Sequence, residues 1–215
     1  MRKKIQVLLV DDHSVVRAGY RLLLSQSIGI GDILEADCGE KACELYAREK
    51  PGVVVMDLSM PGIGGLDTIR RICARDPSAR ILVFSIHDEP VYVAKAVEAG
   101  ARGYITKSSA PDIMVEAVAR IAEGKIYIEQ GLANSSAPDT QDHRDSQSVV
   151  ASLTAREFDI FILLARGMTV REIAEQLCIG YKTVANYSTA IKGKLGVTTG
   201  AELAGFAYEL DLIKH

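Results

Sequence analysis

The chain has 215 residues, of which 48 % are apolar, so it can build one or two packed cores. Its formal net charge is only -3, so overall charge does not indicate a nucleic-acid-binding or membrane-surface protein. No stretch approaches the roughly 18 continuous apolar residues of a membrane span, and no membrane partner is expected. The four cysteines lack metal-ligand spacing and are expected to be reduced thiols of a cytoplasmic protein.

Residues 1–128 alternate short apolar runs with helical patterns, which predicts an α/β domain with a doubly wound parallel sheet. Right-handed crossovers favour the flavodoxin-like strand order 2-1-3-4-5. The expected strands are Ile5–Val10, Ile33–Ala36, Val53–Met56, Ile81–Ser85 and Gly103–Thr106. The expected helices lie near residues 14–26, 40–49, 66–75, 91–99 and 112–123.

The composition changes after this domain. Residues 129–150 are expected to be a flexible linker, because residues 131–148, GLANSSAPDTQDHRDSQS, are polar and have no period. Residues 151–215 show no strand signal and contain four helical patterns. The sequence therefore predicts a second, all-α domain of four helices.

Two capping boxes and a tight turn organise the predicted helical domain. Thr154 with Glu157 marks the start of its first helix, and Thr169 with Glu172 marks the start of its second. After a turn containing Gly180, apolar residues recur at helical spacing and predict a third helix with one buried face. Two short helices joined by such a turn indicate a helix-turn-helix, and a final helix is expected over residues 201–210.

Three carboxylates follow two strands that the predicted topology makes neighbours. Asp11 and Asp12 end the first strand, and Asp57 ends the third. Ligands bind beside the carboxyl ends of strands in such sheets. Three carboxylates so near to one another repel unless a cation is present. Oxygen-only sites of this kind suit Mg²⁺. The alternative is that these residues are ordinary solvated acids in loops. The presence of three acids at two adjacent strand ends favours the metal site over this alternative.

A hydroxyl and an ammonium complete the predicted pocket. Ser85 ends the fourth strand and Lys107 follows the fifth. Together with the acids and Mg²⁺ they outline a site for a phosphoryl group, in which positioning and electrostatics supply most of the catalysis. Asp57 is then the expected nucleophile, because a carboxylate that attacks phosphorus forms an aspartyl-phosphate.

The motifs LLVDDH, VVVMDLSMPGIGGLD, ILVFS and GARGYITK resemble the receiver domain of two-component response regulators. The resemblance implies that Asp57 is the phosphoacceptor and that Asp12, Asp57 and the Ser59 carbonyl bind Mg²⁺ with support from Asp11. It also implies that Ser85 is the switch hydroxyl and Tyr104 the switch aromatic, which turns inward on phosphorylation, with Lys107 binding the phosphoryl group. Ser59 is further expected to influence the lifetime of the phosphoryl group.

Two other features receive plainer interpretations. His13 is expected to cap or pack at the start of the helix that follows it. Gly62, Gly64 and Gly65 lack the GxGxxG spacing and the position that a dinucleotide-binding loop requires.

The third helix of the second domain is the candidate DNA-reading element. It carries lysines but no acid, and a locally positive helix is expected against phosphates. Asn186 can pair with adenine, and Thr189 can meet a base edge. The alternative is an ordinary helical bundle with a solvated lysine face. The predicted DNA-binding residues are Lys182, Thr183, Ala185, Asn186, Thr189, Lys192 and Lys194.

The stretch LTAREFDIFILLARGMTVREIAEQLCIGYKTVANY resembles the LuxR-type helix-turn-helix, and the two domains together resemble the NarL/FixJ family of transcription factors. The chain departs from that family at Ala185 and Tyr187, where members often carry Lys and His, so the target DNA cannot be taken from relatives. The resemblance implies phosphorylation by a sensor histidine kinase, a homodimer when phosphorylated, binding to double-stranded DNA, and RNA polymerase as a further contact.

Two other classes of protein remain open from the sequence. An aspartyl phosphatase of the haloacid dehalogenase type requires a second acid two residues after the nucleophile, where this chain has Ser59. An adaptor that signals by protein contact would carry a helical domain unable to bind DNA, for which the absence of Lys at position 185 is the supporting feature. The chain is expected not to be an enzyme.

Overall fold

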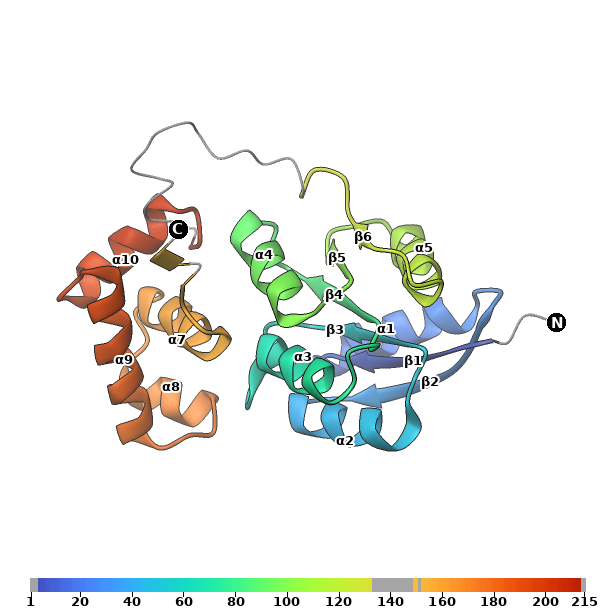
Figure 1. Ribbon diagram of the computed structural model, residues 1–215, viewed down its shortest axis with the longest axis horizontal. Helices are drawn as coiled ribbons and strands as arrows, with labels where there is room; N and C mark the ends of the chain where they lie inside the picture. The colour runs from blue at the N-terminus through green and yellow to red at the C-terminus, as the bar shows by residue number, and fades with distance from the viewer. Residues whose placement is uncertain (1–3, 133–148, 151, 214–215) are drawn as a thin grey trace. The chain divides into compact units, whose positions relative to one another are not determined.

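The computed structural model describes residues 4–132, 149–150 and 152–213. The chain divides into two compact units, Met1–Ala133 and Asn134–His215 (Figure 1). Most of the predicted linker, residues 129–150, lies outside the described residues. No helix among the residues described has the length and apolar character needed to cross a bilayer.

The first unit is an α/β domain around a parallel sheet. The strands follow the order β2-β1-β3-β4-β5-β6, which confirms the predicted order and adds a sixth strand. Its strands are β1 (Ile5–Val10), β2 (Ile30–Ala36), β3 (Val53–Met56), β4 (Ile81–Ser85), β5 (Gly103–Thr106) and β6 (Tyr127–Ile128). Its helices are α1 (Ser14–Ser25), α2 (Gly39–Glu49), α3 (Gly64–Arg75), α4 (Pro90–Ala99) and α5 (Pro111–Ala122).

Two strand assignments differ from the sequence prediction. Strand β2 begins at Ile30 and not Ile33, because Ile30 pairs with Ile5 across an irregularity in the β1–β2 register. Gly31 and Asp32 have low strand propensity, and pairing with β1 overrides it. Strand β6 was not predicted, because two residues carry too little periodicity, and it exists through parallel pairing with β5.

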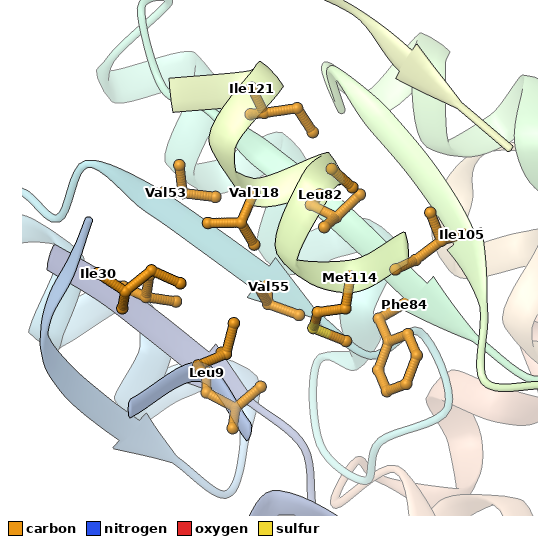
Figure 2. Close-up of a cluster of buried hydrophobic side chains, with 13 residues drawn as sticks. Leu9, Ile30, Val53, Val55, Leu82, Phe84, Ile105, Met114, Val118 and Ile121 are labelled. Atoms are coloured by element: carbon orange, nitrogen blue, oxygen red, sulfur yellow. The ribbon is translucent and has the colours of Figure 1, made fainter. Parts of the chain in front are cut away.

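Helices cover both faces of the sheet, so the central strands are buried on both sides. Figure 2 shows α5 side chains, among them Met114 and Val118, against Val55 and Leu82 of the strands. Helix α1 packs on this same face through Leu24. Helices α2, α3 and α4 contact one another in succession and cover the other face. The core thus fixes the strands whose carboxyl ends carry the candidate site.

The second unit is helical in its described residues. Its helices are α7 (Ala155–Ala165), α8 (Val170–Gln176), α9 (Tyr181–Leu195) and α10 (Gly200–Glu209). Both predicted capping boxes form, and a third, unpredicted one from Thr199 and Glu202 starts α10. The predicted buried stripe of α9 is confirmed, since Val184 and Ile191 are fully buried. Helix α9 contacts both α7 and α8, as a helix-turn-helix requires.

Candidate functional site

The acidic residues converge because β1 and β3 are adjacent and end at the same edge of the sheet. Asp11 and Asp57 follow these strands, and the Asp57 amide donates to the carbonyl of Val10 at 2.9 Å. Ligand atoms of Asp11, Asp12, His13 and Asp57 all lie within 4.8 Å of one another. The structure therefore brings the three predicted acids together in one cluster.

Lys107 binds two of these carboxylates at once. Its Nζ lies 2.8 Å from Asp11 Oδ2 and 2.8 Å from Asp57 Oδ2, and both aspartates are only 1 % exposed. Burial raises the pKa of Asp57, and the Lys107 charge opposes this rise only in part. Burial alone would lower the pKa of Lys107, but the two carboxylates raise it above its ordinary value. One ammonium thus neutralises a pair of buried acids incompletely.

The loop after β3 holds Asp57 in a defined orientation. The Ser59 amide donates to Asp57 Oδ1 at 3.1 Å. Helix α3 begins against the same loop, and a Cβ on Gly65 would clash with the Asp57 carbonyl and Leu58 Cα. Glycine at this position is therefore explained by close backbone approach and not by nucleotide binding.

The donor set suits a hard cation. Asp12 Oδ1 is buried and accepts no hydrogen bond from any described residue. His13 Nδ1 lies 3.0 Å from it, which is ion-pair range when the imidazole is protonated. His13 is the N-cap residue of α1, but its side chain makes no capping bond, whereas its amide donates to Asp11 Oδ1. A buried carboxylate oxygen that accepts no hydrogen bond from the described residues, next to two buried acids, fits a divalent ion that prefers oxygen ligands.

The two predicted switch residues lie beside this cluster. Tyr104 is fully buried, and its hydroxyl donates to the His87 carbonyl at 2.9 Å. The structure thus describes Tyr104 in the inward position that the sequence analysis assigned to the phosphorylated form. Burial raises the pKa of Tyr104, so its phenol stays a donor. The Ser85 hydroxyl is also buried and accepts the His87 amide at 3.2 Å.

His87 is a site residue that the sequence analysis missed. Its Nε2 lies 3.2 Å from the Ser59 hydroxyl, and its ring stacks on Tyr92 with centroids 3.9 Å apart. Its main chain contacts both Ser85 and Tyr104, as described above. Periodicity gives no signal for such a residue, but its place two residues after a strand end could have identified it.

Helix α9 presents most of the predicted DNA-binding side chains to solvent. Lys182, Thr183, Asn186 and Thr189 are exposed, whereas Ala185 and Lys192 are half-buried. The Thr189 hydroxyl donates to the Ala185 carbonyl at 3.1 Å, a bond that a base contact would have to replace or share.

Lys194 has a partner within its own unit. Its Nζ lies 2.7 Å from Glu157 Oε2, and Glu157 is buried and also accepts the Thr154 amide at 2.8 Å. Burial would raise the pKa of Glu157, but Lys194 and Thr154 hold it below the ordinary value. The ion pair joins the start of α7 to the last turn of α9. The predicted DNA contact of Lys194 stays a prediction, and it would compete with this bond.

Comparison with known proteins matches both units. The response regulator receiver domain matches residues 7–119, and the luxR family of bacterial regulatory proteins matches residues 151–207. The chain belongs to the response-regulator family. This response regulator is 42 % identical over 209 residues to the transcriptional activator protein ExaE of Pseudomonas putida, covering 97 % of this chain and 98 % of ExaE.

A second relative agrees with this assignment, and a solved structure shares the fold. The response regulator UvrY of Escherichia coli strain K12 is 39 % identical over 203 residues, covering 94 % of this response regulator and 93 % of UvrY. RcsB from Salmonella enterica serovar Typhimurium, solved bound to a promoter in the presence of the phosphomimetic BeF3-, superimposes with a TM-score of 0.66. It is 23 % identical and covers 96 % of this chain and 100 % of its own, a likeness that concerns the fold alone.

The predicted NarL/FixJ membership and two-domain fold are thereby confirmed. The protein is a response regulator with a LuxR-type DNA-binding domain, and its relatives are transcriptional regulators and not enzymes. Proteins of the response-regulator family interact with histidine kinases and DNA. Their receiver domains generally bind Mg²⁺ at an acidic pocket, and a cluster of acids of this kind is present here.

Proposed function

We propose that Asp57 is the phosphoacceptor through which this response regulator is controlled. The observation that carries the proposal is the arrangement of two buried carboxylates, Asp11 and Asp57, around the single ammonium of Lys107. A purely structural ion pair needs one acid for each base, since an extra buried charge is costly. The second carboxylate instead leaves negative charge that a bound cation can neutralise, and it leaves Asp57 able to react.

Asp12, Asp57 and the Ser59 carbonyl would hold Mg²⁺, with Asp11 supporting them. The supporting observations are that Asp12 Oδ1 accepts no hydrogen bond from the described residues and that these three ligands offer only oxygen atoms. When bound, Mg²⁺ would neutralise negative charge on the transferring phosphoryl group.

The chain's own residues position and complete the transfer. A carboxylate oxygen of Asp57 attacks the phosphorus of a phosphohistidine on a sensor histidine kinase, or of a small phosphodonor. The O–P bond forms as the P–N bond of the phosphohistidine, or the P–O bond of an acyl phosphate donor, breaks, and the imidazole or carboxylate leaves with the electron pair. Lys107, which contacts Asp57 Oδ2, then pairs with a phosphoryl oxygen, and the Ser85 hydroxyl supplies a hydrogen bond to another.

The phosphoryl group acts by biasing a two-state surface of the receiver domain. Ser85 and Tyr104 are linked through His87, so movement of the Ser85 hydroxyl toward the phosphoryl group changes the acceptor environment of the Tyr104 hydroxyl. We assign residues 1–128 to the receiver domain, 129–150 to the linker and 151–215 to the DNA-binding domain of a cytoplasmic protein.

The output is sequence-specific binding of a phosphorylated homodimer to double-stranded DNA. Helix α9 would enter the major groove, with Lys182, Thr183 and Lys192 toward phosphates and Asn186 and Thr189 toward bases. A dimer would read two half-sites on the DNA. The dimer bound there would contact RNA polymerase and so control transcription. Ala185, with its small side chain, and Lys194, bound to Glu157, would contribute least to the interface.

Labelling with acetyl phosphate tests the acceptor. The wild type is expected to gain one phosphoryl group in the presence of Mg²⁺, and Asp57→Asn is expected to gain none. Labelling of the variant at another residue refutes the assignment. Selection of bound DNA from a random pool, with and without phosphodonor, tests the output, since an adaptor would recover no common sequence.

A further inference from the structure

Glu129 lies directly after β6 and binds the loop that carries Lys107. Its Oε2 accepts the Thr106 amide at 2.9 Å and the Thr106 hydroxyl at 3.3 Å. The Ser109 hydroxyl lies within donating distance of both oxygens, at 2.7 Å from Oε1 and 2.6 Å from Oε2. A single carboxylate therefore holds the β5–α5 loop on both sides of Lys107.

The main chain of Glu129 belongs to the same connection. Its amide donates to the Tyr104 carbonyl at 3.0 Å, which extends the pairing of Ile128 with Tyr104 in the sheet. Its carbonyl accepts the amide of Leu132, whose side chain is buried. One residue thus contacts the strand of the switch tyrosine through its backbone and the lysine loop through its side chain. From here the chain runs on toward the second unit.

Phosphorylation acts on the loop that Glu129 holds. Lys107 now pairs with Asp11 and Asp57, and its amide donates to the Ser85 carbonyl at 2.7 Å. A phosphoryl group on Asp57 places the negative charge farther from the Asp57 carboxyl carbon, so the ammonium and its loop must adjust. Hydrogen bonds to a carboxylate are short and strong, and they oppose independent movement of the loop and β6.

We propose that Glu129 is a positioning residue that couples capture of the phosphoryl group by Lys107 to the segment leading out of the receiver domain. It touches neither the phosphoryl group nor DNA, and it acts by making the lysine loop and residues 127–132 move as one body. This inference rests on the proposed function and adds the path by which the acceptor site reaches the linker.

The test compares DNA binding with and without acetyl phosphate, using a DNA selected from a random pool by the wild-type protein. The ratio of the two dissociation constants measures coupling, which for allosteric proteins is typically about 5- to 150-fold. Glu129→Ala is expected to keep Asp57 labelling and affinity without phosphodonor, while its ratio falls to about 2-fold or less. Ser109→Ala is expected to lower the ratio likewise, and the double variant should lower it no further, because both remove one connection.

Glu116→Ala is the matched control. It removes the same charge from the same domain, at an exposed α5 position whose carboxylate pairs with Arg120 at 3.1 Å, and its ratio is expected to equal that of the wild type. Should Glu129→Ala fail to fold, Glu129→Gln and Ser109→Ala test the proposal in its place. Glu129→Gln retains one acceptor oxygen and is expected to give a ratio between those of the wild type and Ser109→Ala.

A labelled Glu129→Ala protein with the wild-type ratio overturns the coupling role and leaves the proposed function intact. Equal loss of the ratio in Glu116→Ala also overturns it, since a general charge effect would then explain the result. A wild type that is not labelled at Asp57 overturns both proposals.

Discussion

Replacing Asp57 by Asn is expected to stabilise the receiver domain in the absence of metal. At an effective dielectric constant of about 20, unit charges 2.8 Å apart attract by about 6 kcal/mol, and like charges within 4.8 Å repel by at least about 3.5 kcal/mol. Losing the Asp57 charge therefore removes at most about 2.5 kcal/mol of net attraction to Lys107 and Asp11. It also removes the desolvation cost of a buried carboxylate, which is several kcal/mol.

The direction of the Asp57 pKa decides between these opposing effects. Burial contributes most to that pKa and raises it, so desolvation outweighs the attraction of Lys107. Asp57→Asn is accordingly expected to raise the free energy of unfolding by about 1–3 kcal/mol at pH 7. A carboxyl whose pKa is higher in the folded state lowers stability as pH rises above its ordinary pKa, because the unfolded chain then loses the proton first. The difference in unfolding free energy is thus expected to be absent well below pH 3.8, the ordinary pKa, to grow as pH rises from 3.8 toward the raised pKa of the folded state, and to be constant above it.

Urea unfolding followed by far-ultraviolet circular dichroism measures this difference, because the chain contains no tryptophan. In EDTA the variant should unfold at higher urea concentration, while any separate transition of the helical unit keeps its midpoint as an internal control. Adding Mg²⁺ should stabilise the wild type more than the variant and narrow the gap, since a ligand stabilises the state that binds it. A variant no more stable than the wild type in EDTA, or equal stabilisation of both by Mg²⁺, would refute the reasoning.

Four further variants test other parts of the molecule. Gly65→Ala is expected to cost about 1–3 kcal/mol in urea unfolding and to slow acetyl phosphate labelling, because its Cβ meets the Asp57 loop; unchanged values contradict the close approach. Lys194→Met should destabilise the helical unit in thermal unfolding by about 1–3 kcal/mol. Because the Glu157 pKa is lowered in the folded state, the stabilisation by the Lys194–Glu157 ion pair is expected to be present above about pH 4.5, the ordinary pKa, and to be lost on acidification. A destabilisation by Lys194→Met that does not change with pH would contradict this role of the ion pair. Asn186→Ala should reduce the discrimination at one A·T base pair by about 1–3 kcal/mol in DNA-binding measurements. Lys182→Ala should weaken binding to all DNA sequences equally and reduce the dependence of affinity on salt concentration. If both variants weaken binding to all sequences equally, Asn186 makes no base contact.

The candidate site divides clearly into parts that the sequence could predict and parts that it could not. Asp57, Asp11 and Lys107 were predictable, because each follows a strongly apolar strand and strand ends in a parallel sheet share one edge. The contacts of His87 and Glu129 were not, because they cross between strands and loops, and for His87 only its place two residues after a strand end gave a signal. Glu129 stands in what the sequence shows only as the start of a polar linker, and its carboxylate has a role only because β6 pairs with β5.

The amino-acid sequence by itself determined the order of the first five strands, the helices with two of their three capping boxes, and the acids and lysine at the strand ends. These follow from local periodicity, side-chain capping and a topology with few alternatives. Only the tertiary structure decided that Tyr104 lies inward against His87, that Lys194 is bound to Glu157, and that Glu129 holds the lysine loop. Each of these depends on how side chains share a small number of partners in space, which no local pattern records.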